Sequence, residues 1–314
     1  MDSKTAIIYY CYNRKSHTEK SLTKILEYNK NSPLFIFIDG PKTPLDSILV
    51  EQVKSYVQGS IDNSNKCKLI FRDKNYGLAK NVICGVNEVF NLGFESVIVI
   101  EDDCVPDASF FPFVNDALKT LRLNKKVMHI SGFGLPMKFK PQKGYYYSPY
   151  PCSWGWATWK DRWDKCDFED NSYYRQVLNN KELTDQFDWA GKSFSHFLKL
   201  QQAGAVNSWL IRWYAHIFKN NGVCLWPTYT CLKNIGFDGS GIHQVSFDRF
   251  NQPANHKIKR VNFDNEIKLD PYTITHFKQF FMGPKLIDKL KTVLYNLTGI
   301  FFEKQTNLPQ KYKK

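Results

Sequence analysis

Short apolar runs alternate with longer amphipathic stretches along the first part of the chain. The runs comprise residues 6–10, 34–38, 67–71, 96–100 and 127–131. We expect each run to form one strand, because each has the length of a typical strand. The run at 96–100 reads SVIVI and does not alternate with polar residues. Such continuous hydrophobicity is typical of a strand that is buried on both faces of a parallel sheet.

The stretches between these runs have helical spacing. Ser16 and Glu19 have the form of a capping box and predict the start of a helix. Residues 45–57, residues 77–91 and the segment after Pro106 carry apolar residues at helical spacing and predict further helices. Repeated strand–helix–strand units predict an α/β fold with a mostly parallel, doubly wound sheet and helices on both faces.

The regular alternation stops near residue 136. The rest of the chain contains an aromatic stretch at 145–163, helical patterns at 173–204 and 208–220, a strand-like run at 223–226, a basic polar segment after His243 and a candidate helix at 284–302. We therefore expect an irregular second lobe that is followed by a C-terminal amphipathic helix.

Composition and charge limit the class of protein. Hydrophobic residues make up 43% and aromatic residues 16% of the 314 residues, which is enough for a full core. The net charge of +13 favours an anionic partner, such as nucleic acid, an acidic membrane surface or a phosphorylated small molecule. A solubilising surface explains this charge equally well. Lys and Arg are spread along the chain without a dense basic block, so we expect no nucleic-acid partner.

The cysteines and the short apolar runs bear on localisation. None of the eight cysteines forms a Cys-x-x-Cys pair, which disfavours a zinc ribbon. Several of them, such as Cys11 and Cys84, lie inside apolar patterns, which is typical of reduced, mostly buried thiols in a cytosolic protein. The first apolar run is too short for a signal peptide, and no stretch approaches the roughly 20 apolar residues of a membrane helix. We expect a cytoplasmic protein, and peripheral attachment to the inner face of the cell membrane is the open alternative.

Three consecutive carboxylates follow the most apolar of the predicted strands. Glu101, Asp102 and Asp103 come directly after the run at 96–100. In an open α/β sheet, ligands bind at the carboxyl ends of the strands. Adjacent carboxylates repel one another, and Mg²⁺ or Mn²⁺ would compensate them while also binding substrate phosphates. A solvated acidic turn is the alternative, but the position at a strand end favours a metal site.

The segment around this acidic triplet resembles a family of known enzymes. Residues 100–111 (IEDDCVPDASFF) are similar to the metal-binding segment of the GlcNAc-transferase that initiates complex N-glycans. Related bacterial family 2-like glycosyltransferases of the GT-A fold share that segment. Further similar segments follow the family's order: YCYNR at 10–14, FID at 37–39, NYGLAKN at 75–81, SWGWATW at 153–159 and NIGFDGSGIH at 234–243. The resemblance covers about residues 5–245 and implies a GT-A, Rossmann-like fold.

The resemblance implies roles for the acidic residues. Asp103 would bind the metal, Mn²⁺ or Mg²⁺, and Asp102 would approach the ribose or a metal-bound water. Glu101 would support Asp102 and Asp103 without binding the metal directly. His243, near the end of the last similar segment, would complete the metal shell, although a loop histidine without a ligand role is nearly as good an interpretation. The metal takes up charge as the nucleoside diphosphate departs.

The resemblance also implies a surface that binds the sugar donor. Its expected residues are Asn13 and Arg14 after the first strand, Asp39 after the second, Asn75 and Lys80 before the metal strand, and Gly155 and Trp156 in a glycine loop beneath the donor sugar. Structural alternatives exist for several of them: Arg14 starts a helix, Asp39 precedes a Gly-Pro turn, and Lys80 lies on a helix face. Of the tryptophans at 154, 156, 159 and 163, we expect two to be purely structural.

The catalytic base is the missing part of the pattern. An inverting enzyme needs a carboxylate or histidine that takes the proton of the acceptor hydroxyl. The family places an acid beside a tryptophan in the region that here reads NSWLIRW, at 207–213, and this region contains no acid. Asp188, Asp238 and His243 are the candidate substitutes. A retaining mechanism would need no such base.

The expected activity is a metal-dependent transfer of a hexosyl or N-acetylhexosaminyl group from a nucleoside-diphosphate sugar, with inversion. The acceptor would be a glycan or lipid-linked glycan in bacterial surface polysaccharide synthesis. A catalytically inactive pseudoenzyme of the same fold, which binds nucleotide sugar or glycan, is the alternative. A sugar-nucleotide pyrophosphorylase is disfavoured, because residues 10–16 lack the glycines that its phosphate loop requires.

The predicted organisation has three parts. Residues 1–135 would bind the nucleotide sugar, and residues 136–265 would hold the donor sugar and the acceptor as the second half of the same domain. Residues 266–314 would form a basic extension, in which apolar residues at 284–302 form a stripe opposite lysines. This stripe predicts either an anchor on an anionic membrane surface or a helix that docks onto the catalytic domain.

Overall fold

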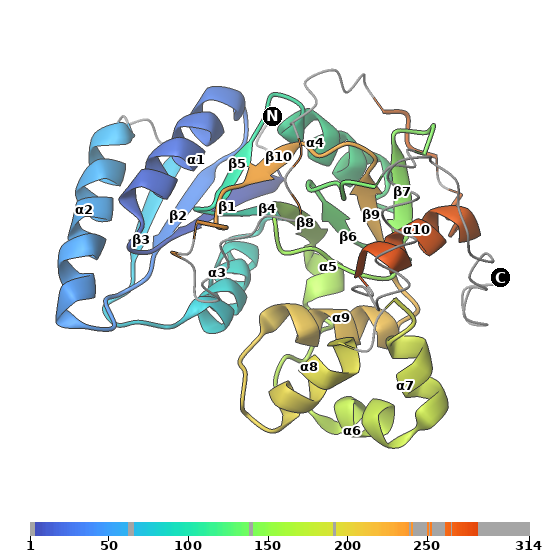
Figure 1. The fold of residues 1–314 in the computed structure, drawn as a ribbon. Coiled ribbons are helices and arrows are strands. Elements are labelled where there is room, and N and C mark those ends of the chain that lie inside the picture. Colours follow the sequence, from blue (N-terminus) through green and yellow to red (C-terminus); the bar gives the residue numbers. More distant parts are fainter. Residues whose placement is uncertain are drawn as a thin grey trace.

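A computed structural model describes residues 4–61, 66–137, 141–190, 193–238, 240, 250, 252, 261–264 and 266–281. Within these residues one eight-stranded sheet has the order β3-β2-β1-β4-β8-β6-β9-β7 (Figure 1). Its strands are β1 Thr5–Cys11, β2 Leu34–Ile38, β3 Cys67–Phe71, β4 Ser96–Glu101, β6 Val127–Ser131, β7 Tyr145–Ser148, β8 Trp156–Trp159 and β9 Val223–Pro227. A separate antiparallel pair joins β5 Cys104–Pro106 to β10 Leu232–Asn234.

The first half of the sheet confirms the predicted parallel α/β architecture. Strands β3, β2, β1 and β4 are parallel neighbours, and β6 runs parallel to β9. Every residue of β2 is buried, and β4 is buried up to its last residue, Glu101. This burial agrees with their continuous apolar sequences, because both faces of the sheet are covered.

The helices of the first half also agree with the predicted spacing. They are α1 Lys15–Tyr28, α2 Pro44–Ser60, α3 Leu78–Asn91 and α4 Phe110–Thr120. The predicted capping box of Ser16 and Glu19 is wrong, because α1 begins one residue before Ser16 and its N-cap residue, Arg14, makes no side-chain cap. A capping box does form at α2, between Thr43 and Asp46.

The second half is more regular than its sequence indicated. The aromatic stretch was expected to be irregular, but it contains β7, β8 and the short helix α5 Lys160–Trp163. Strand β8 lies between β4 and β6 and is antiparallel to both. The sheet therefore continues from the first half of the chain into the second.

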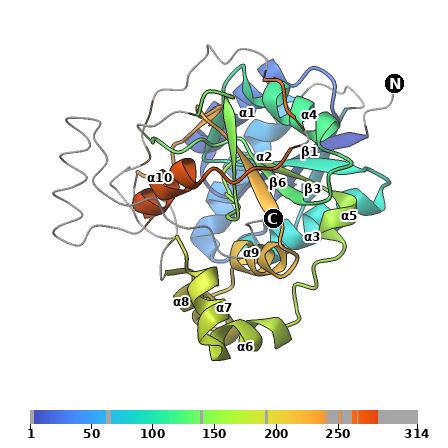
Figure 2. The same cartoon turned by 90° about the vertical axis from the view of Figure 1, so that its right-hand side faces the viewer.

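A group of helices lies below the sheet (Figures 1 and 2). Its members are α6 Ser172–Asn179, α7 Lys181–Phe187, α8 Ser193–Gln202 and α9 Trp209–Lys219. The single helical pattern predicted for 173–204 is therefore divided into three helices. Asn180 interrupts it, because its side-chain oxygen accepts a hydrogen bond from the backbone of Leu183 (3.0 Å) and caps α7.

One further helix, α10 Pro271–Phe281, was not predicted. Its Phe277 is fully buried, and its ring lies 5.3 Å from that of Trp226 on β9 and 6.3 Å from that of Tyr146 on β7. No helix among the described residues is both long and apolar enough to span a membrane. The candidate helix at 284–302 lies outside the described residues.

Candidate functional site

The loops after β1 and β4 meet at the point where the strand order reverses. Strand β1 pairs with β2 on one side and with β4 on the other, and all three are parallel. From β1 the chain proceeds outward through β2 and β3 and then returns to β4 on the other side of β1. Such a switch point leaves a crevice at the carboxyl ends of the strands, where open α/β sheets bind their ligands. Arg14 follows β1, and Asp102 and Asp103 follow β4.

Arg14 connects the two strand ends by ion pairs. Its Nε donates to Oδ2 of Asp102 (3.3 Å), and its Nη2 donates both to Oδ1 of Asp102 and to Oδ2 of Asp103 (3.1 Å). The three side chains are 19%, 7% and 18% exposed, respectively. Arg14 therefore compensates two adjacent carboxylates that are largely removed from water.

Among the described residues, Arg14 pairs with two of the three carboxyl groups of the triplet. Burial raises the pKa of Asp102 to about 6, although the charge of Arg14 and its hydrogen bonds act in the opposite direction. Burial, together with the charges of Asp103 and Asp102, raises the pKa of Glu101 well above its usual value. Oε1 of Glu101 is buried and has no hydrogen-bond partner. A site of this kind gains from a further cation.

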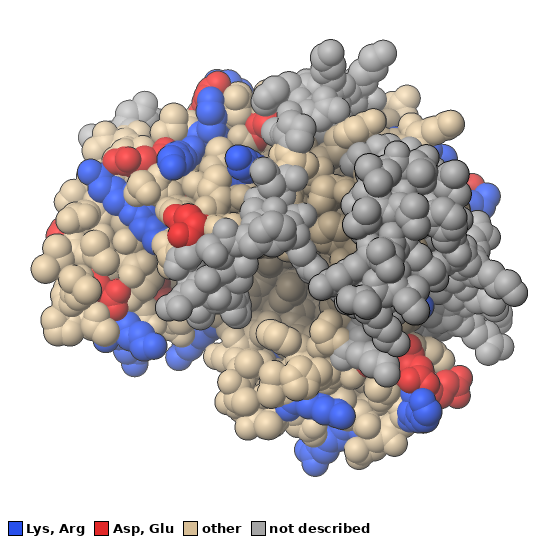
Figure 3. All heavy atoms as spheres, viewed as in Figure 1, with Lys and Arg blue, Asp and Glu red and all other residues tan. Residues whose placement is uncertain are grey.

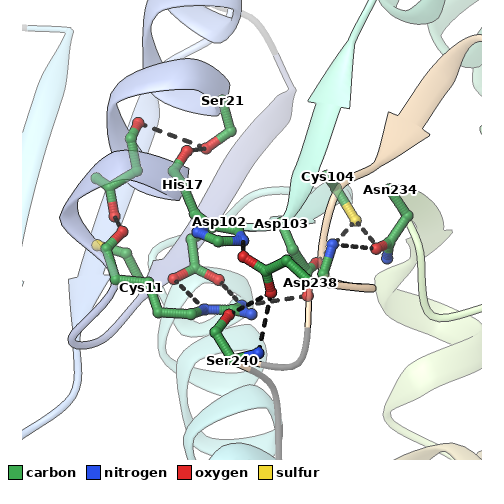
Figure 4. A network of polar contacts seen from close by, with 12 residues as sticks. Cys11, His17, Ser21, Asp102, Asp103, Cys104, Asn234, Asp238 and Ser240 are labelled. Carbon is green, nitrogen blue, oxygen red and sulfur yellow. Dashed lines mark hydrogen bonds and ion pairs between the residues drawn. The ribbon is translucent and has the colours of Figure 1, made fainter. Parts of the chain in front are cut away.

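The loop after β10 passes close to Asp103 (Figure 4). The backbone of Ile235 donates to the carbonyl oxygen of Asp103 (2.8 Å), and the backbone of Gly236 donates to the side chain of Asn234 (2.8 Å). A Cβ atom at position 236 would lie 2.6 Å from Oδ2 of Asp103. Glycine at this position therefore permits the close approach of the loop.

The same loop brings Asp238 to the triplet. Oδ2 of Asp238 lies 3.3 Å from Nε2 of His17, a buried residue one helical turn after Arg14. Oδ1 of Asp238 accepts hydrogen bonds from the backbone (3.0 Å) and hydroxyl (2.6 Å) of Ser240. Sequence reasoning missed His17, although its spacing from Arg14 on one helix could have indicated it.

Asp39 and Asn75 join the loops at the ends of β2 and β3. The carboxylate of Asp39 accepts hydrogen bonds from the backbone of Gly40 (3.0 Å), Tyr76 (2.8 Å) and Gly77 (3.0 Å). The side chain of Asn75 donates to the carbonyl oxygen of Gly40 (2.8 Å). Both residues therefore shape the edge of the sheet at which the resemblance places the nucleotide.

Two cations lie beside one aromatic ring at this edge. Nζ of Lys80 is 5.0 Å and the guanidinium carbon of Arg72 is 4.7 Å from the ring centre of Tyr76. Arg72 is not among the donor-binding residues that the sequence predicts. Asn13 belongs to the same edge, where its side chain donates to Oδ1 of Asp46 at the start of α2 (2.8 Å). The edge thus combines positive charge with an aromatic surface.

The predicted glycine loop lies at the start of β8. Gly155 has a φ angle of +55°, and a Cβ atom there would lie 2.2 Å from the side chain of Leu232. The ring of Trp156 is fully buried and stacks against Trp209, with 4.8 Å between ring centres. The ring of Trp156 therefore belongs to the core, and its contact with a donor sugar stays a prediction. Trp154 is only partly buried and packs edge-on against Phe133 (4.7 Å).

The candidate bases occupy different places. Asp188 lies directly after α7, and its carboxylate accepts hydrogen bonds from the backbone (2.7 Å) and hydroxyl (2.5 Å) of Ser195 in α8. It therefore joins two helices of the group below the sheet, whereas Asp238 lies beside the triplet. His243 lies outside the described residues.

The triplet has the donor atoms that a hard divalent cation requires. Asp102 and Asp103 present carboxylate oxygens, the ligands that Mg²⁺ and Mn²⁺ prefer, and Glu101 adds an unpartnered oxygen behind them. In the part of the chain that the structure describes, no group of three or more His, Cys, Asp or Glu side chains is arranged to hold a metal by itself. The residues therefore fit a cation that takes one or two protein carboxylates and completes its shell with substrate phosphates.

Comparisons with known proteins add little to this picture. No protein-family model and no curated protein sequence matches the chain. Among solved structures, a crystal structure of residues 1–349 of S. aureus TarS matches with a TM-score of 0.30 and 13% identity. The match covers 45% of this chain and 39% of that one, so the chain spans well under half of the matched structure.

Proposed function

We propose that this protein is a glycosyltransferase that uses a nucleoside-diphosphate sugar and a divalent cation, Mn²⁺ or Mg²⁺. The observation that carries the proposal is the meeting of Arg14 with Asp102 and Asp103 at the switch point between β1 and β4. This arrangement combines a phosphate-binding cation with metal-binding carboxylates in the crevice where α/β sheets bind nucleotides.

Each part of the arrangement has a task in sugar transfer. Asp103, with Asp102 beside it, would hold the cation, which neutralises the charge that develops on the departing diphosphate. Arg14 would bind the diphosphate oxygens, and the edge formed by Asn13, Tyr76 and Lys80 would bind the nucleoside. The partly buried site limits access of water and thereby strengthens these electrostatic interactions.

The residue that would take the proton of the acceptor hydroxyl is less well defined than the residues that would bind the donor. Asp238, which lies beside His17, is one candidate for the base of an inverting reaction, and Asp188 and His243 are the others. Both carboxylates already accept hydrogen bonds from a neighbouring serine. This observation favours, as a second candidate function, a pseudoenzyme that binds the donor without transferring its sugar.

A ligand screen followed by a turnover assay tests the proposal. Nucleotide sugars of the uridine, guanosine, cytidine and thymidine series are added with and without Mn²⁺, and thermal unfolding is measured. We expect one series to raise the melting temperature only with Mn²⁺, because a ligand that binds the native state stabilises it. Stabilisation in no series, or stabilisation that ignores Mn²⁺, would contradict the proposal.

The same ligand separates an enzyme from a pseudoenzyme. We expect slow, Mn²⁺-dependent release of the nucleoside diphosphate without acceptor, because glycosyltransferases hydrolyse their donor at a low rate. Donor binding without any release, with or without a panel of glycan acceptors, would instead favour the pseudoenzyme.

A further inference from the structure

The guanidinium of Arg14 occupies the position that the proposed cation needs. Its Nη2 contacts both Oδ1 of Asp102 and Oδ2 of Asp103, at 3.1 Å from the latter. These are oxygens that a divalent cation would use at this strand end. Among the described residues, the ion pairs of Asp102 and Asp103 both go to Arg14. The two carboxylates that would bind the metal therefore already have a cation, the guanidinium of Arg14.

Arg14 and a divalent cation cannot share these oxygens without cost. Arginine does not lose its proton in proteins, so its repulsion of a second cation cannot be relieved by deprotonation. The side chains of Arg14, Asp102 and Asp103 are all less than one-fifth exposed, so water and salt screen this repulsion weakly. A metal that binds alone has to displace Arg14 from both carboxylates.

A diphosphate would give Arg14 another partner. The planar fork of a guanidinium matches two phosphate oxygens as well as it matches a carboxylate. Arg14 is the N-cap residue of α1 and follows β1 at the switch point, so its long side chain starts from the crevice itself. A bound diphosphate can therefore take Arg14 away from Asp102 and Asp103 and leave their oxygens to the metal.

We infer that Arg14 is an internal counter-cation that couples the metal and the donor. It keeps the affinity for the metal low in the free protein and releases Asp102 and Asp103 when a nucleoside diphosphate binds. The inference rests on the proposed function and adds to it that the two ligands bind cooperatively. Because coupling is reciprocal, the metal raises the affinity for the diphosphate by the same factor.

Binding of Mn²⁺ alone tests this inference without any turnover. Free Mn²⁺ is measured by electron paramagnetic resonance during titration of the wild type, of Arg14→Gln and of Lys15→Gln. Lys15 is the matched control, because it is the next residue, is half exposed and pairs with Glu19 rather than with the triplet. We expect Arg14→Gln to bind Mn²⁺ at least about tenfold more tightly than the wild type, within the usual range of coupling between sites. Lys15→Gln should leave the affinity unchanged.

A second arm measures the coupling. UDP and GDP are added at saturating concentration, and the nucleotide that binds should raise the affinity of the wild type for Mn²⁺ about tenfold or more. In Arg14→Gln this increase should be much smaller, because the carboxylates are already available. Arg14→Gln should also melt at a lower temperature than the wild type without metal, and Mn²⁺ should restore most of the difference.

The outcomes separate this inference from the proposed function. If Arg14→Gln binds Mn²⁺ no more tightly than the wild type, and Asp103→Asn abolishes binding, the inference is wrong and the proposed function stands. If neither the wild type nor any variant binds Mn²⁺, with or without nucleotide, both the inference and the proposed function are wrong. If Arg14→Gln does not fold, Arg14→Lys replaces it. Lysine keeps the charge but cannot contact both carboxylates with a planar guanidinium. The Arg14→Lys variant should therefore bind Mn²⁺ more tightly than the wild type.

Discussion

At the scale of single residues, Asp103 carries the most specific prediction. Asp103→Asn keeps the size of the side chain and removes the charge that the cation needs. We expect the unliganded variant to melt near the wild type, because Arg14 keeps its ion pair with Asp102 and the change removes one of two adjacent like charges. Stabilisation by donor and Mn²⁺ should disappear, and sugar transfer should fall by at least ~10²-fold, since a cation held by few carboxylates cannot lose one. Melting curves and an assay of sugar transfer measure both effects.

A control for Asp103 lies four residues further along the chain. Asp107 is buried, and its Oδ1 accepts a hydrogen bond from the backbone of Ser109 (2.7 Å), which the side-chain oxygen of asparagine can also accept. Asp107→Asn should therefore keep metal-dependent binding and transfer. If Asp103→Asn retained metal-dependent turnover near the wild type, the proposed metal site would be wrong.

Gly236 gives a second prediction at this scale. A Cβ atom at 236 would lie 2.6 Å from Oδ2 of Asp103, so Gly236→Ala has to move the loop or the carboxylate. We expect the affinity for Mn²⁺ in the presence of donor to fall, because a metal site tolerates little displacement of its ligands. Titration of the variant with Mn²⁺ measures the effect.

Gly59→Ala is the matched control for that substitution. Gly59 lies in α2, and a Cβ atom there would have no neighbour within 4 Å. Alanine is favoured over glycine inside a helix by about 0.5–1 kcal/mol, so this variant should be slightly more stable and bind Mn²⁺ normally. Equal Mn²⁺ affinities for both alanine variants would show that the loop after β10 does not constrain Asp103.

At the scale of elements, Asp188 has two possible roles that one pair of variants can separate. Its carboxylate joins the end of α7 to α8 through the backbone and hydroxyl of Ser195. Both Asp188→Asn and Ser195→Ala should therefore lower the free energy of unfolding by about 1 kcal/mol, the usual value for a lost or weakened hydrogen bond. Denaturant unfolding measures this loss.

Sugar transfer by the same two variants shows whether Asp188 is the catalytic base. If Asp188 is the base, Asp188→Asn loses transfer by ~10²-fold or more and keeps its affinity for the nucleotide, whereas Ser195→Ala keeps both. If both variants transfer sugar at the rate of the wild type below their melting temperatures, Asp188 is structural and Asp238 remains the candidate.

The elements of the first half could be predicted from the sequence because their patterns are local. The bounds of β2, β3 and β6 agree with the apolar runs, and β2 and β6 are buried along their whole length. The capping box at Ser16 failed because Ser and Glu at this spacing also occur inside a helix. Only the structure shows that α1 begins at Lys15.

In the second half, α9 and β9 agree with the helix predicted at 208–220 and the strand predicted at 223–226, but the other strands could not be predicted in the same way. Strand β10, like its partner β5 in the first half, has three residues, which is too short for a periodic pattern. Strand β8 is rich in tryptophan, so its sequence resembles a ligand-binding loop as much as a strand. Its place between two antiparallel neighbours depends on residues far away in the sequence. For the site, the triplet could be found by its position after β4. The contacts of Arg14, His17 and Asp238 depend on tertiary packing.

At the scale of the whole molecule, the distribution of charge bears on the partner, as far as the described residues show it. On the face shown in Figure 3, Lys and Arg are scattered among acidic and uncharged residues, and the surface is hollowed at its centre. A net charge of +13 spread in this way suits an anionic small molecule in the crevice or an anionic surface nearby.

Removal of the C-terminal segment tests contact with such a surface. A protein of residues 1–283 keeps α10, whose Phe277 packs against β7 and β9, so the sheet should remain covered. We expect the full chain to float with anionic vesicles and the shortened protein to float less, because the sequence at 284–302 predicts a helix with an apolar stripe opposite lysines. Equal flotation of the two proteins would contradict a membrane anchor.

The stability of the whole fold should depend on pH through a buried histidine. His129 is fully buried on β6, where its Nδ1 accepts a hydrogen bond from Nε1 of Trp213 (3.3 Å) and its Nε2 lies 3.0 Å from the carbonyl oxygen of Cys152. These partners fit the neutral ring, and burial lowers the pKa of His129 to about 3. In the unfolded chain a histidine has a pKa of about 6.5.

The sign of the effect follows from proton binding. Between about pH 6.5 and pH 3 the unfolded chain binds a proton at His129 that the folded protein does not bind, so the free energy of unfolding falls as the pH falls. One such group changes the free energy of unfolding by at most about 1.4 kcal/mol per pH unit. Above about pH 7 it causes no change with pH. Asp102 acts in the opposite direction below its pKa of about 6, because there the folded protein binds the additional proton.

Comparison with His129→Gln isolates the histidine from Asp102. Glutamine can accept from Trp213 and donate to Cys152 but has no proton to gain in this range. Urea unfolding at intervals from pH 8 to pH 4 should show that the wild type loses more stability on acidification than the variant, while their difference stays constant above about pH 7. The variant should be less stable at neutral pH, since it loses the stacking of His129 on Trp156. Parallel curves throughout would show that His129 is not held neutral by the core, and that acid sensitivity of the fold arises elsewhere.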